Sequence, residues 1–441
     1  MHFSNLVLIL VAAVASASGY DVAPRPSIVP FPKAPGRALP VSPARDPSKV
    51  CIVCPKSGGD AAAAILKAAH DCNDGGTVVF MPNATYTISS RVDLTFLKHI
   101  DFAILGTIVF NADVEYWQTN TFAYRYQNVN LMWRFGGEDV NIYGLGQGTI
   151  DGLGQTWWNA LAGNSTVVRP LLLGTDGLNG GSITGLKMIN SPNWFNIIAN
   201  SSDILISDMN LSVVVTNVTS PAKNTDGWDT YRSDNIVIQN SIIDNTDDCV
   251  SFKPNSTEVL VQGLVCNGSH GISVGSLGQY QGQVDIIEDL YIYNISMSNA
   301  SDGARIKIWP GVPPNTTGSE AGGGLGHVRN VTYEKYHNVN NDWAIQLTQC
   351  YFAASDEACQ QYPFEATLVI EDILFKDFTG TTSKKNDPRV GSLICSDPSV
   401  CKNIQAHNIN VSPPSGKGPK WTCTNMDNSL LDIDCIRSPV A

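Results

Sequence analysis

The sequence predicts an all-β parallel β-helix, a solenoid in which short strands stack coil upon coil. Strand-like segments recur after about residue 76, and their β-branched or leucine residues alternate with polar ones, at residues 203–206, 235–238, 258–261, 289–292, 330–333 and 372–375. Recurrence at about 20 to 30 residues is typical of solenoids. A doubly wound sheet would need a helix of about 10–15 residues between strands. An antiparallel sandwich remains the alternative.

One helix is expected at the start of the solenoid. The alanine-rich segment 61–70 follows Asp60. Alanine has the highest helix propensity, and aspartate is a favourable N-cap. It is almost the only convincing helical segment in the chain. Because the open end of a stacked sheet invites aggregation, we expect this helix to cap the N-terminal end.

The N-terminal part of the chain differs in composition from the rest. Residues 1–17 have the apolar run and the small-residue ending of a signal peptide, and the run is too short to span a membrane. Residues 18–48 form a proline-rich arm, extended or disordered, with the composition of a pro-segment. We therefore expect a secreted protein in which residues 49–441 form a single β-helix domain.

Charge excludes one broad class of partner. The chain of 441 residues has a formal net charge of −12, and charged residues make up 15% of it. Binding to nucleic acid needs a basic face that neutralises phosphates, so we expect no nucleic-acid partner. A polyanionic substrate requires only that a few cations gather in one cleft.

Cysteines and glycosylation sequons agree with an oxidising compartment. Close spacing among the 11 cysteines suggests the local disulfides Cys249–Cys266, Cys350–Cys359, Cys395–Cys401 and Cys423–Cys435. The pairing of Cys51, Cys54 and Cys72 stays open. Twelve sequons are candidate glycosylation sites: Asn83, Asn164, Asn200, Asn210, Asn217, Asn255, Asn267, Asn294, Asn299, Asn315, Asn330 and Asn410.

Asp226, Asp248 and His270 follow one another at equal steps in the sequence, at positions i, i+22 and i+44. If one coil has the length of this step, these side chains form a column across three adjacent coils, about 4.8 Å apart. Asp247 precedes Asp248, and neighbouring strand residues face opposite sides. Both carboxylates reach one cleft only if the chain bends at residues 246–249.

Carboxylates held this close cannot all ionise freely, so we expect at least one raised pKa. Different pKa values let one carboxyl act as a general acid and another as a general base, the pair that a glycosidase needs. Arg305 and Lys307 would bind an anionic sugar. A calcium site is the competing interpretation, but His270 and the two cations argue against it.

Four motifs carry a resemblance to a known family: Asn224–Gly227, Asp247–Cys249, Gly268–Gly271 and Arg305–Lys307. Their order and spacing resemble those of the polygalacturonases, family 28 of the glycoside hydrolases. The resemblance implies a right-handed parallel β-helix. It also implies hydrolysis of α-1,4-galacturonosyl bonds in pectin, with inversion of configuration and without a metal ion or other cofactor.

The resemblance also implies roles for individual residues. Asp247 would donate a proton to the leaving oxygen, Asp226 and Asp248 would activate water, and His270 would support the protonation of the acid. Substrate-binding residues would be Asn224, Arg305, Lys307 and Tyr351. The acid–base set and the low isoelectric point, about 5.0, predict an acidic pH optimum.

Ser269, within the motif Gly268–Gly271, and the segment 228–232 resemble the corresponding residues of the fungal exo-polygalacturonases. We expect the irregular stretches 115–135 and 309–326 to block one end of the cleft. The expected partner is homogalacturonan, with no membrane partner, and the protein is expected to be a monomer. The alternatives are an endo-polygalacturonase, a xylogalacturonan hydrolase, a calcium-dependent pectate lyase and a non-catalytic polysaccharide-binding β-helix.

Overall fold

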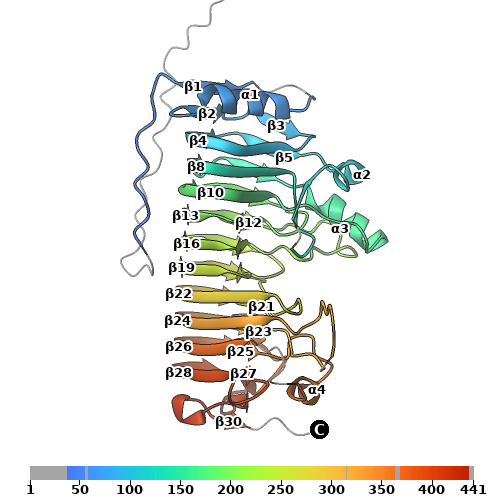
Figure 1. Ribbon diagram of the computed structural model, residues 1–441, viewed down its shortest axis with the longest axis vertical. Helices are drawn as coiled ribbons and strands as arrows, with labels where there is room; N and C mark the ends of the chain where they lie inside the picture. Colours follow the sequence, from blue (N-terminus) through green and yellow to red (C-terminus); the bar gives the residue numbers. More distant parts are fainter. Residues whose placement is uncertain (1–36, 55–57, 125, 314, 363–367, 437–441) are drawn as a thin grey trace, which may run out of the picture.

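The computed structural model describes residues 37–54, 58–124, 126–313, 315–362 and 368–436 (Figure 1). Within these residues, 28 strands join into one sheet that winds through a tall stack of coils, and its strands pair in parallel. This arrangement confirms the predicted parallel β-helix and is incompatible with an antiparallel sandwich. The predicted signal peptide and residues 18–36 of the arm lie outside the described residues.

Three rows of strands form the walls of the stack. The first row contains β1 Val50–Val53, β2 Thr77–Phe80, β4 Val92–Ile104, β8 Trp133–Tyr143, β10 Leu173–Thr184, β13 Ser202–Ser207, β16 Ser233–Gln239, β19 Ser256–Gln262, β22 Val284–Ser298, β24 Leu325–Asn341, β26 Val369–Thr382 and β28 Cys401–Ser412. The second contains β3 Thr85–Ile88, β5 Thr107–Phe110, β9 Thr149–Asp151, β11 Lys187–Ile189, β14 Asn210–Ser212, β17 Ile242–Asp244 and β20 Val265–Asn267.

The third row runs from β10 through a series of shorter strands and carries the site described below. These strands are β12 Asn196–Ala199, β15 Trp228–Tyr231, β18 Val250–Phe252, β21 Ile272–Leu277, β23 Asp302–Ile308, β25 Trp343–Thr348, β27 Arg389–Ile394, β29 Lys420–Thr424 and β30 Cys435–Ile436. A separate antiparallel hairpin, β6 Phe122–Ala123 and β7 Asn130–Leu131, stands beside the stack.

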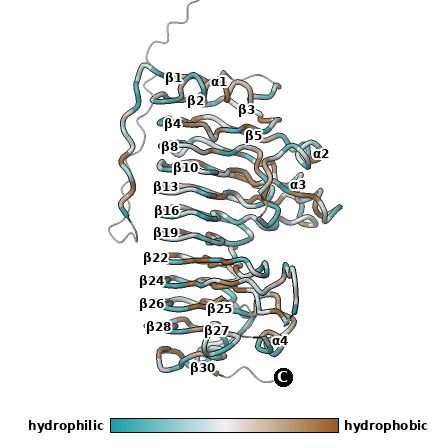
Figure 2. Tube along the Cα trace, in the orientation of Figure 1, coloured by the Kyte–Doolittle hydropathy of each residue, from teal (hydrophilic) through white to brown (hydrophobic). Residues whose placement is uncertain are grey.

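The core is built from columns of apolar side chains that stack directly on one another. Figure 2 shows hydrophobic residues in every coil of the stack. One column follows the register of the first row, and all of its members are buried: Ile204, Ile236, Val259, Leu290, Val331, Ile373 and Ile404. Each belongs to one of the predicted repeat segments or to the next coil, so the recurrence in the sequence corresponds to this column.

A polar column marks the corner that precedes these apolar residues. Its members have positive φ, which asparagine and aspartate adopt more readily than other non-glycine residues: Asp203, Asn235, Glu258, Asp289, Asn330, Asp372 and Asn403. Side-chain amides donate hydrogen bonds to carboxylates of the preceding coil, as from Asn235 Nδ2 to Asp203 Oδ1 at 2.6 Å and from Asn403 Nδ2 to Asp372 Oδ1 at 2.7 Å. The corner therefore turns the chain and links successive coils.

Helix α1, Ala62–Cys72, covers the N-terminal end of the stack as predicted (Figure 1). Asp60 Oδ1 accepts a hydrogen bond from the Ala62 amide at 3.1 Å, and the helix buries Ile65 and Ala69. The shorter helices are α2 Val114–Trp117, α4 Asp356–Gln360 and the 3-10 turn η1 Asn428–Leu430. None of the helices within the described part of the chain is long and apolar enough to cross a membrane.

The expectation of almost no second helix was wrong at α3, Gly154–Gly163. This segment contains glycine and asparagine, which lower helix propensity. Its two tryptophans, Trp157 and Trp158, are almost completely buried. Packing of these large side chains therefore overrides the weak local preference.

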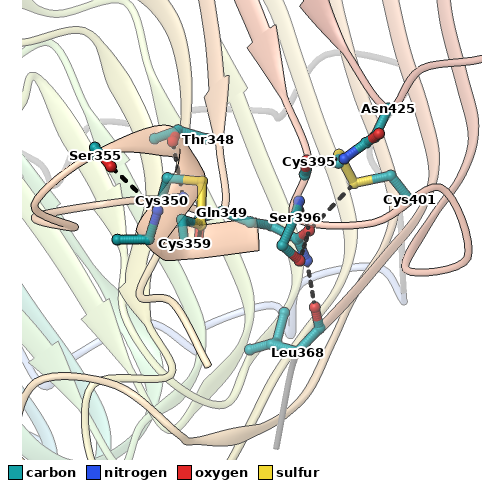
Figure 3. The surroundings of a disulfide bond; sticks show 11 residues. Thr348, Gln349, Cys350, Ser355, Cys359, Leu368, Cys395, Ser396, Cys401 and Asn425 are labelled. Carbon is teal, nitrogen blue, oxygen red and sulfur yellow. Dashed lines mark hydrogen bonds between the residues drawn. A yellow bond between two sulfur atoms is a disulfide. The ribbon is translucent and has the colours of Figure 1, made fainter. Parts of the chain in front are cut away.

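All four predicted disulfides are present, together with Cys51–Cys72, which joins β1 to α1. Cys54 is a free, exposed thiol. Figure 3 shows that Cys350–Cys359 and Cys395–Cys401 lie on either side of Gln349. The Gln349 amide donates to Leu368 O at 2.7 Å and accepts from the Ser396 hydroxyl at 3.0 Å. These bonds tie loops of the C-terminal coils together.

The described part of the proline-rich arm runs from Arg37 upward along the first row of strands to β1 (left side of Figure 1). Arg37 pairs with Asp203 and Asp234, and Leu39 packs against an apolar cluster that includes Leu205. Residues 37–48 thus contact several coils of the stack.

Candidate active site

One cavity of about 680 Å³ lies against the third row of strands and collects the predicted site residues. Seven of the eight line it: Asn224, Asp226, Asp247, His270, Arg305, Lys307 and Tyr351. The eighth, Asp248, is fully buried and contacts Lys307. Side chains that lie far apart in the sequence therefore meet at one place.

The register of the third row explains this convergence. Trp228 pairs with Val250 and Val250 with Ile272, so each coil here has the length of the step between the site residues, as predicted. Asp226, Asp248 and His270 each lie just before these paired positions, at i−2. Their segments are bonded by Gly227 N to Asp248 O at 2.9 Å and Cys249 N to Gly271 O at 2.8 Å.

The predicted bend at residues 246–249 is present and is held by Asn245. The buried Asn245 amide donates to Thr225 O at 2.8 Å, Asp247 O at 3.0 Å and Asp248 O at 2.9 Å. Three carbonyl groups are thereby fixed by one side chain. The bend allows Asp247 to reach the cavity beside Asp226.

Asp247 forms an ion pair with His270, with 3.1 Å between Oδ1 and Nδ1. Asn224 Nδ2 donates a hydrogen bond to the other carboxylate oxygen of Asp247, Oδ2, at 3.2 Å. Burial alone would raise the pKa of Asp247, but the hydrogen bond and charge of His270, with Lys307 and Lys253, hold it well below its ordinary value. The same hydrogen bond raises the pKa of His270. The proton of this pair therefore lies on the imidazole.

Asp226 has the opposite electrostatic environment. Burial, followed by the charges of Asp247 and Asp229, raises its pKa well above the ordinary value, which confirms that one carboxyl of the cluster is shifted upward. Its Oδ1 is buried and has no hydrogen-bond partner among the described residues. This oxygen is free to hold a water molecule or a substrate hydroxyl.

Asp248 is engaged on both carboxylate oxygens. Lys307 Nζ donates to Oδ2 at 2.5 Å, and the Ser273 hydroxyl donates to Oδ1 at 2.7 Å. The side chain is fully buried. In this geometry Asp248 fixes the lysine ammonium at the cavity wall.

Arg305 and Tyr351 also line the cavity. Arg305 Nη1 lies 3.5 Å from Asp302 Oδ2, and its Nε has no hydrogen-bond partner among the described residues. The guanidinium lies 5.7 Å and the Lys307 ammonium 5.8 Å from the centre of the Tyr351 ring. Both cations lie on the same strand, β23, at alternate positions, as predicted. An anionic group in the cavity would meet them there.

Sequence reasoning missed Lys253, Asp229 and Arg169. Lys253 lines the cavity next to Asp226 and Asp229. A lysine directly after the apolar strand 250–252 is the signal that could have identified it. Arg169 donates to Asn224 Oδ1 at 2.8 Å and to Lys223 O at 2.6 Å, and so orients Asn224. No local pattern marks Arg169.

Two residues of the cavity lining join two loops. Gln127 Nε2, in the turn of the β6–β7 hairpin, donates to Gln279 Oε1 at 3.0 Å. The neighbouring Tyr126 stacks on Tyr231 with 4.5 Å between ring centres. Trp309 and Glu320 line the cavity from the other irregular stretch. Both stretches predicted to restrict the cleft therefore border the cavity.

The acidic cluster has the proximity of a cation site but not its donor set. Asp226, Asp247 and Asp248 each place an oxygen within 4.8 Å of the others. However, the three carboxylates are paired with Lys253, His270 and Lys307 respectively. Calcium prefers six to eight oxygen ligands, so a donor set already paired with cations suits it poorly.

Comparisons with known proteins identify the family of the chain. The family model for glycosyl hydrolases family 28 matches residues 87–432. Exopolygalacturonase A of Aspergillus niger is 58% identical over 437 residues, covering 99% of this chain and 100% of its relative. A probable exopolygalacturonase X of Aspergillus fumigatus is 51% identical, covering 98% of both chains.

Solved structures give the same fold. The endo-xylogalacturonan hydrolase of Aspergillus tubingensis superposes with a TM-score of 0.78 at 32% identity, covering 88% of this chain and 99% of the other. The polygalacturonase of Erwinia carotovora has a TM-score of 0.65 at 18% identity, with 91% and 99% coverage, and supports the fold alone. Together with the extent of the family match, these similarities show that the chain belongs to family 28 of the glycosyl hydrolases.

Proposed function

We propose that the protein is an extracellular exo-polygalacturonase that hydrolyses the terminal α-1,4-galacturonosyl bond of polygalacturonate and releases galacturonic acid. The observation that carries this proposal is a cavity lined both by the acid–base cluster and by Arg305, with Gln127 and Gln279 of its lining bonded to each other. The names of the relatives at 58% and 51% identity support the same activity. The proposed catalytic domain spans residues 49–441, after a signal peptide at 1–17 and the arm at 18–48.

In the proposed reaction, water attacks the anomeric carbon while the bond to the leaving oxygen breaks. Asp247 gives its proton to that oxygen, and Asp226 takes a proton from the water through its unpaired Oδ1. His270 supplies the proton that Asp247 donates. Arg305, with Lys307, binds a sugar carboxylate, and Asp248 fixes Lys307.

Inversion of configuration is proposed from the family resemblance rather than from spacing. The three carboxylates have oxygens within 4.8 Å of one another, whereas inverting glycosidases usually separate theirs by about 6.5–9.5 Å. Proton NMR of the first product formed distinguishes the outcomes, because an inverting enzyme releases the β-anomer from an α-linked polymer. Release of the α-anomer would show retention.

Chromatography of early products from polygalacturonate tests the exo mode. Galacturonic acid alone supports it, whereas a ladder of oligomers indicates an endo-polygalacturonase. Gln127→Ala removes the bridge between the loops and is expected to let some oligomers form. The matched control is Gln147→Ala, at an exposed turn remote from the cavity. Xylogalacturonan is assayed in parallel because the A. tubingensis neighbour is named for that substrate.

A substrate with a good leaving group tests which carboxyl is the acid. A 4-nitrophenyl galacturonide needs little protonation, so Asp247→Asn should lose much less activity on it than on polygalacturonate. Asp226→Asn should lose activity on both substrates. The reverse pattern would exchange the two roles.

Homogalacturonan is the proposed partner, and the protein is proposed to act as a monomer without a metal ion or other cofactor. The twelve sequons remain proposed glycosylation sites. Asn330 is a special case because its Nδ2 donates to Asp289 Oδ1 at 2.5 Å, and a glycan on that nitrogen would disturb the corner column.

A further inference from the structure

Lys253 is a buried cation in the cavity wall, directly after β18, and it belongs to none of the four motifs. Its side chain is only 4% exposed. Its Nζ lies 3.2 Å from Asp229 Oδ1, 3.6 Å from Asp226 Oδ2 and 4.6 Å from the centre of the Trp194 ring. An ammonium group withdrawn from water is tolerated when it is paired, so these neighbours fix its position.

The geometry divides the two oxygens of Asp226 between two tasks. Oδ2 faces Lys253, while the buried Oδ1 has no hydrogen-bond partner in the described part of the chain. Asp229, on β15, is completely buried and faces the same ammonium. Lys253 is therefore shared by two carboxylates, one of which lines the cavity.

Other charges surround Asp226 from several elements. Asp247 and Asp248 approach it from the bend before β18, and both raise its pKa. Arg169, from the loop after α3, also feels its charge, and Lys307 lies on β23. Among the described residues, Lys253 is the only cation within 4 Å of a carboxylate oxygen of Asp226.

We propose, resting on the function proposed above, that Lys253 is the positioning residue for Asp226. It holds the carboxylate by Oδ2 and favours its ionised form, so that Oδ1 is able to take the proton from the attacking water. Asp229, whose own pKa burial raises to about 7 although Lys253 lowers it, is the second carboxyl that faces Lys253, and when it is ionised it limits the effect of Lys253 on Asp226. The pair Lys253–Asp229 thereby sets the pH at which the base becomes active.

The pH dependence of kcat/KM on polygalacturonate tests this electrostatic role. Lys253→Met removes a cation, so Asp226 binds its proton more tightly and the acidic limb of the profile moves up by about one to three pH units. Asp229→Asn removes the negative charge that Asp229 carries when it is ionised, so the limb moves down, and by less than it moves up in Lys253→Met because the pKa of Asp229 is raised to about 7. The double variant loses both charges, and its limb returns toward that of the wild type.

Controls separate this role from a structural one. Lys253→Arg keeps the charge and is expected to restore most of the acidic limb, and the exposed Lys402→Met should leave the profile unchanged. If Lys253→Met does not fold, as judged by thermal unfolding, the opposite shift in Asp229→Asn and its reversal in the double variant still decide the question.

Two outcomes overturn the proposal. An unmoved acidic limb in the folded single variants would refute electrostatic control of Asp226. A rise in KM alone, without a shift in the limb, would make Lys253 a sugar-binding residue. Failure of the wild-type protein to release galacturonic acid is a different result, because it would refute the proposed function itself.

Discussion

Replacing Arg45 by methionine tests how the N-terminal segment holds the β-helix together. The Arg45 side chain is 6% exposed. Its Nε lies 2.9 Å from Asp101 Oδ1, its Nη1 lies 2.9 Å from Asp139 Oδ2, and its Nη2 donates to Asp139 O at 3.0 Å. Methionine keeps much of the length of the side chain and removes the charge and the donors. The variant therefore isolates the ion pairs between the segment and two coils.

The pKa of Asp139 gives the scale of the effect. Burial alone would raise it, but hydrogen bonds from Arg45, Ser42 and His99 lower it from 3.8 to about 2. Such a shift corresponds to about 2 kcal/mol of stability at neutral pH, at about 1.36 kcal/mol per unit. Breaking a buried pair costs about 3–5 kcal/mol. Arg45 supplies only part of this shift, but it also pairs with Asp101, so we expect Arg45→Met to lower the free energy of unfolding by about 2–4 kcal/mol at pH 7.

The sign of the pH dependence follows from the direction of the shift. A carboxyl whose pKa is lower in the folded protein stabilises it above the unfolded pKa, and this contribution is lost as the pH falls toward the folded value. The difference in the free energy of unfolding between Arg45→Met and the wild type should therefore be largest at pH 7 and shrink between about pH 4 and pH 2.

Urea unfolding followed by tryptophan fluorescence measures this difference at several pH values. The control is Arg37→Met, whose side chain is 51% exposed and whose surface pairs are expected to contribute about 0–1 kcal/mol. Equal unfolding midpoints for Arg45→Met and the wild type at pH 7 would refute the reasoning. A loss that stays constant down to pH 2 would assign the effect to packing instead of charge.

Three further predictions concern the cavity. Asp247→Asn should lower kcat on polygalacturonate by about 10²–10⁴-fold while substrate still binds, as measured by turnover and by titration calorimetry; near-normal turnover would refute the role of Asp247 as the general acid. Because His270 must be protonated and Asp226 ionised, kcat/KM should fall as the pH rises above the raised pKa of His270 and as it falls below the raised pKa of Asp226, which gives a bell-shaped profile; a rate that keeps rising above pH 8 would contradict the assignment. Chelator should leave activity unchanged and no ultraviolet-absorbing product should form, whereas loss of activity with EDTA would favour a calcium-dependent lyase.

The column of Asp226, Asp248 and His270 could be predicted because stacked coils convert equal spacing in sequence into proximity in space. The apolar column through Ile236 and Val259 was predictable for the same reason. The equal step also required a bend, since strand geometry alone would have turned Asp247 away from the cleft. Regular repetition therefore supplied most of the fold and the centre of the site.

Residues whose partners lie outside this regular step could not be predicted. Arg169 reaches Asn224 from an insertion between coils, and Gln127 meets Gln279 although the two are far apart in the sequence. Neither contact leaves a periodic signal. Lys253 belongs to a regular coil, but the environment of its ammonium group depends on Asp229 and Trp194, which only the folded register brings beside it. The rim and the charge balance of the cavity are therefore properties of the tertiary structure.

Substrate binding offers a physical reason why Asp247 can act as the acid although its pKa is low in this structure. The charges that lower this pKa are His270, Lys307 and Lys253, in that order. A sugar carboxylate bound to Lys307 and Arg305 would cancel part of this field, so the pKa of Asp247 should rise and its protonated form should become easier to populate. A methyl-esterified substrate lacks that negative charge. We therefore expect esterification at the bound position to lower kcat as well as to raise KM, and an effect on KM alone would show that the substrate carboxylate contributes to binding but not to protonation of the acid.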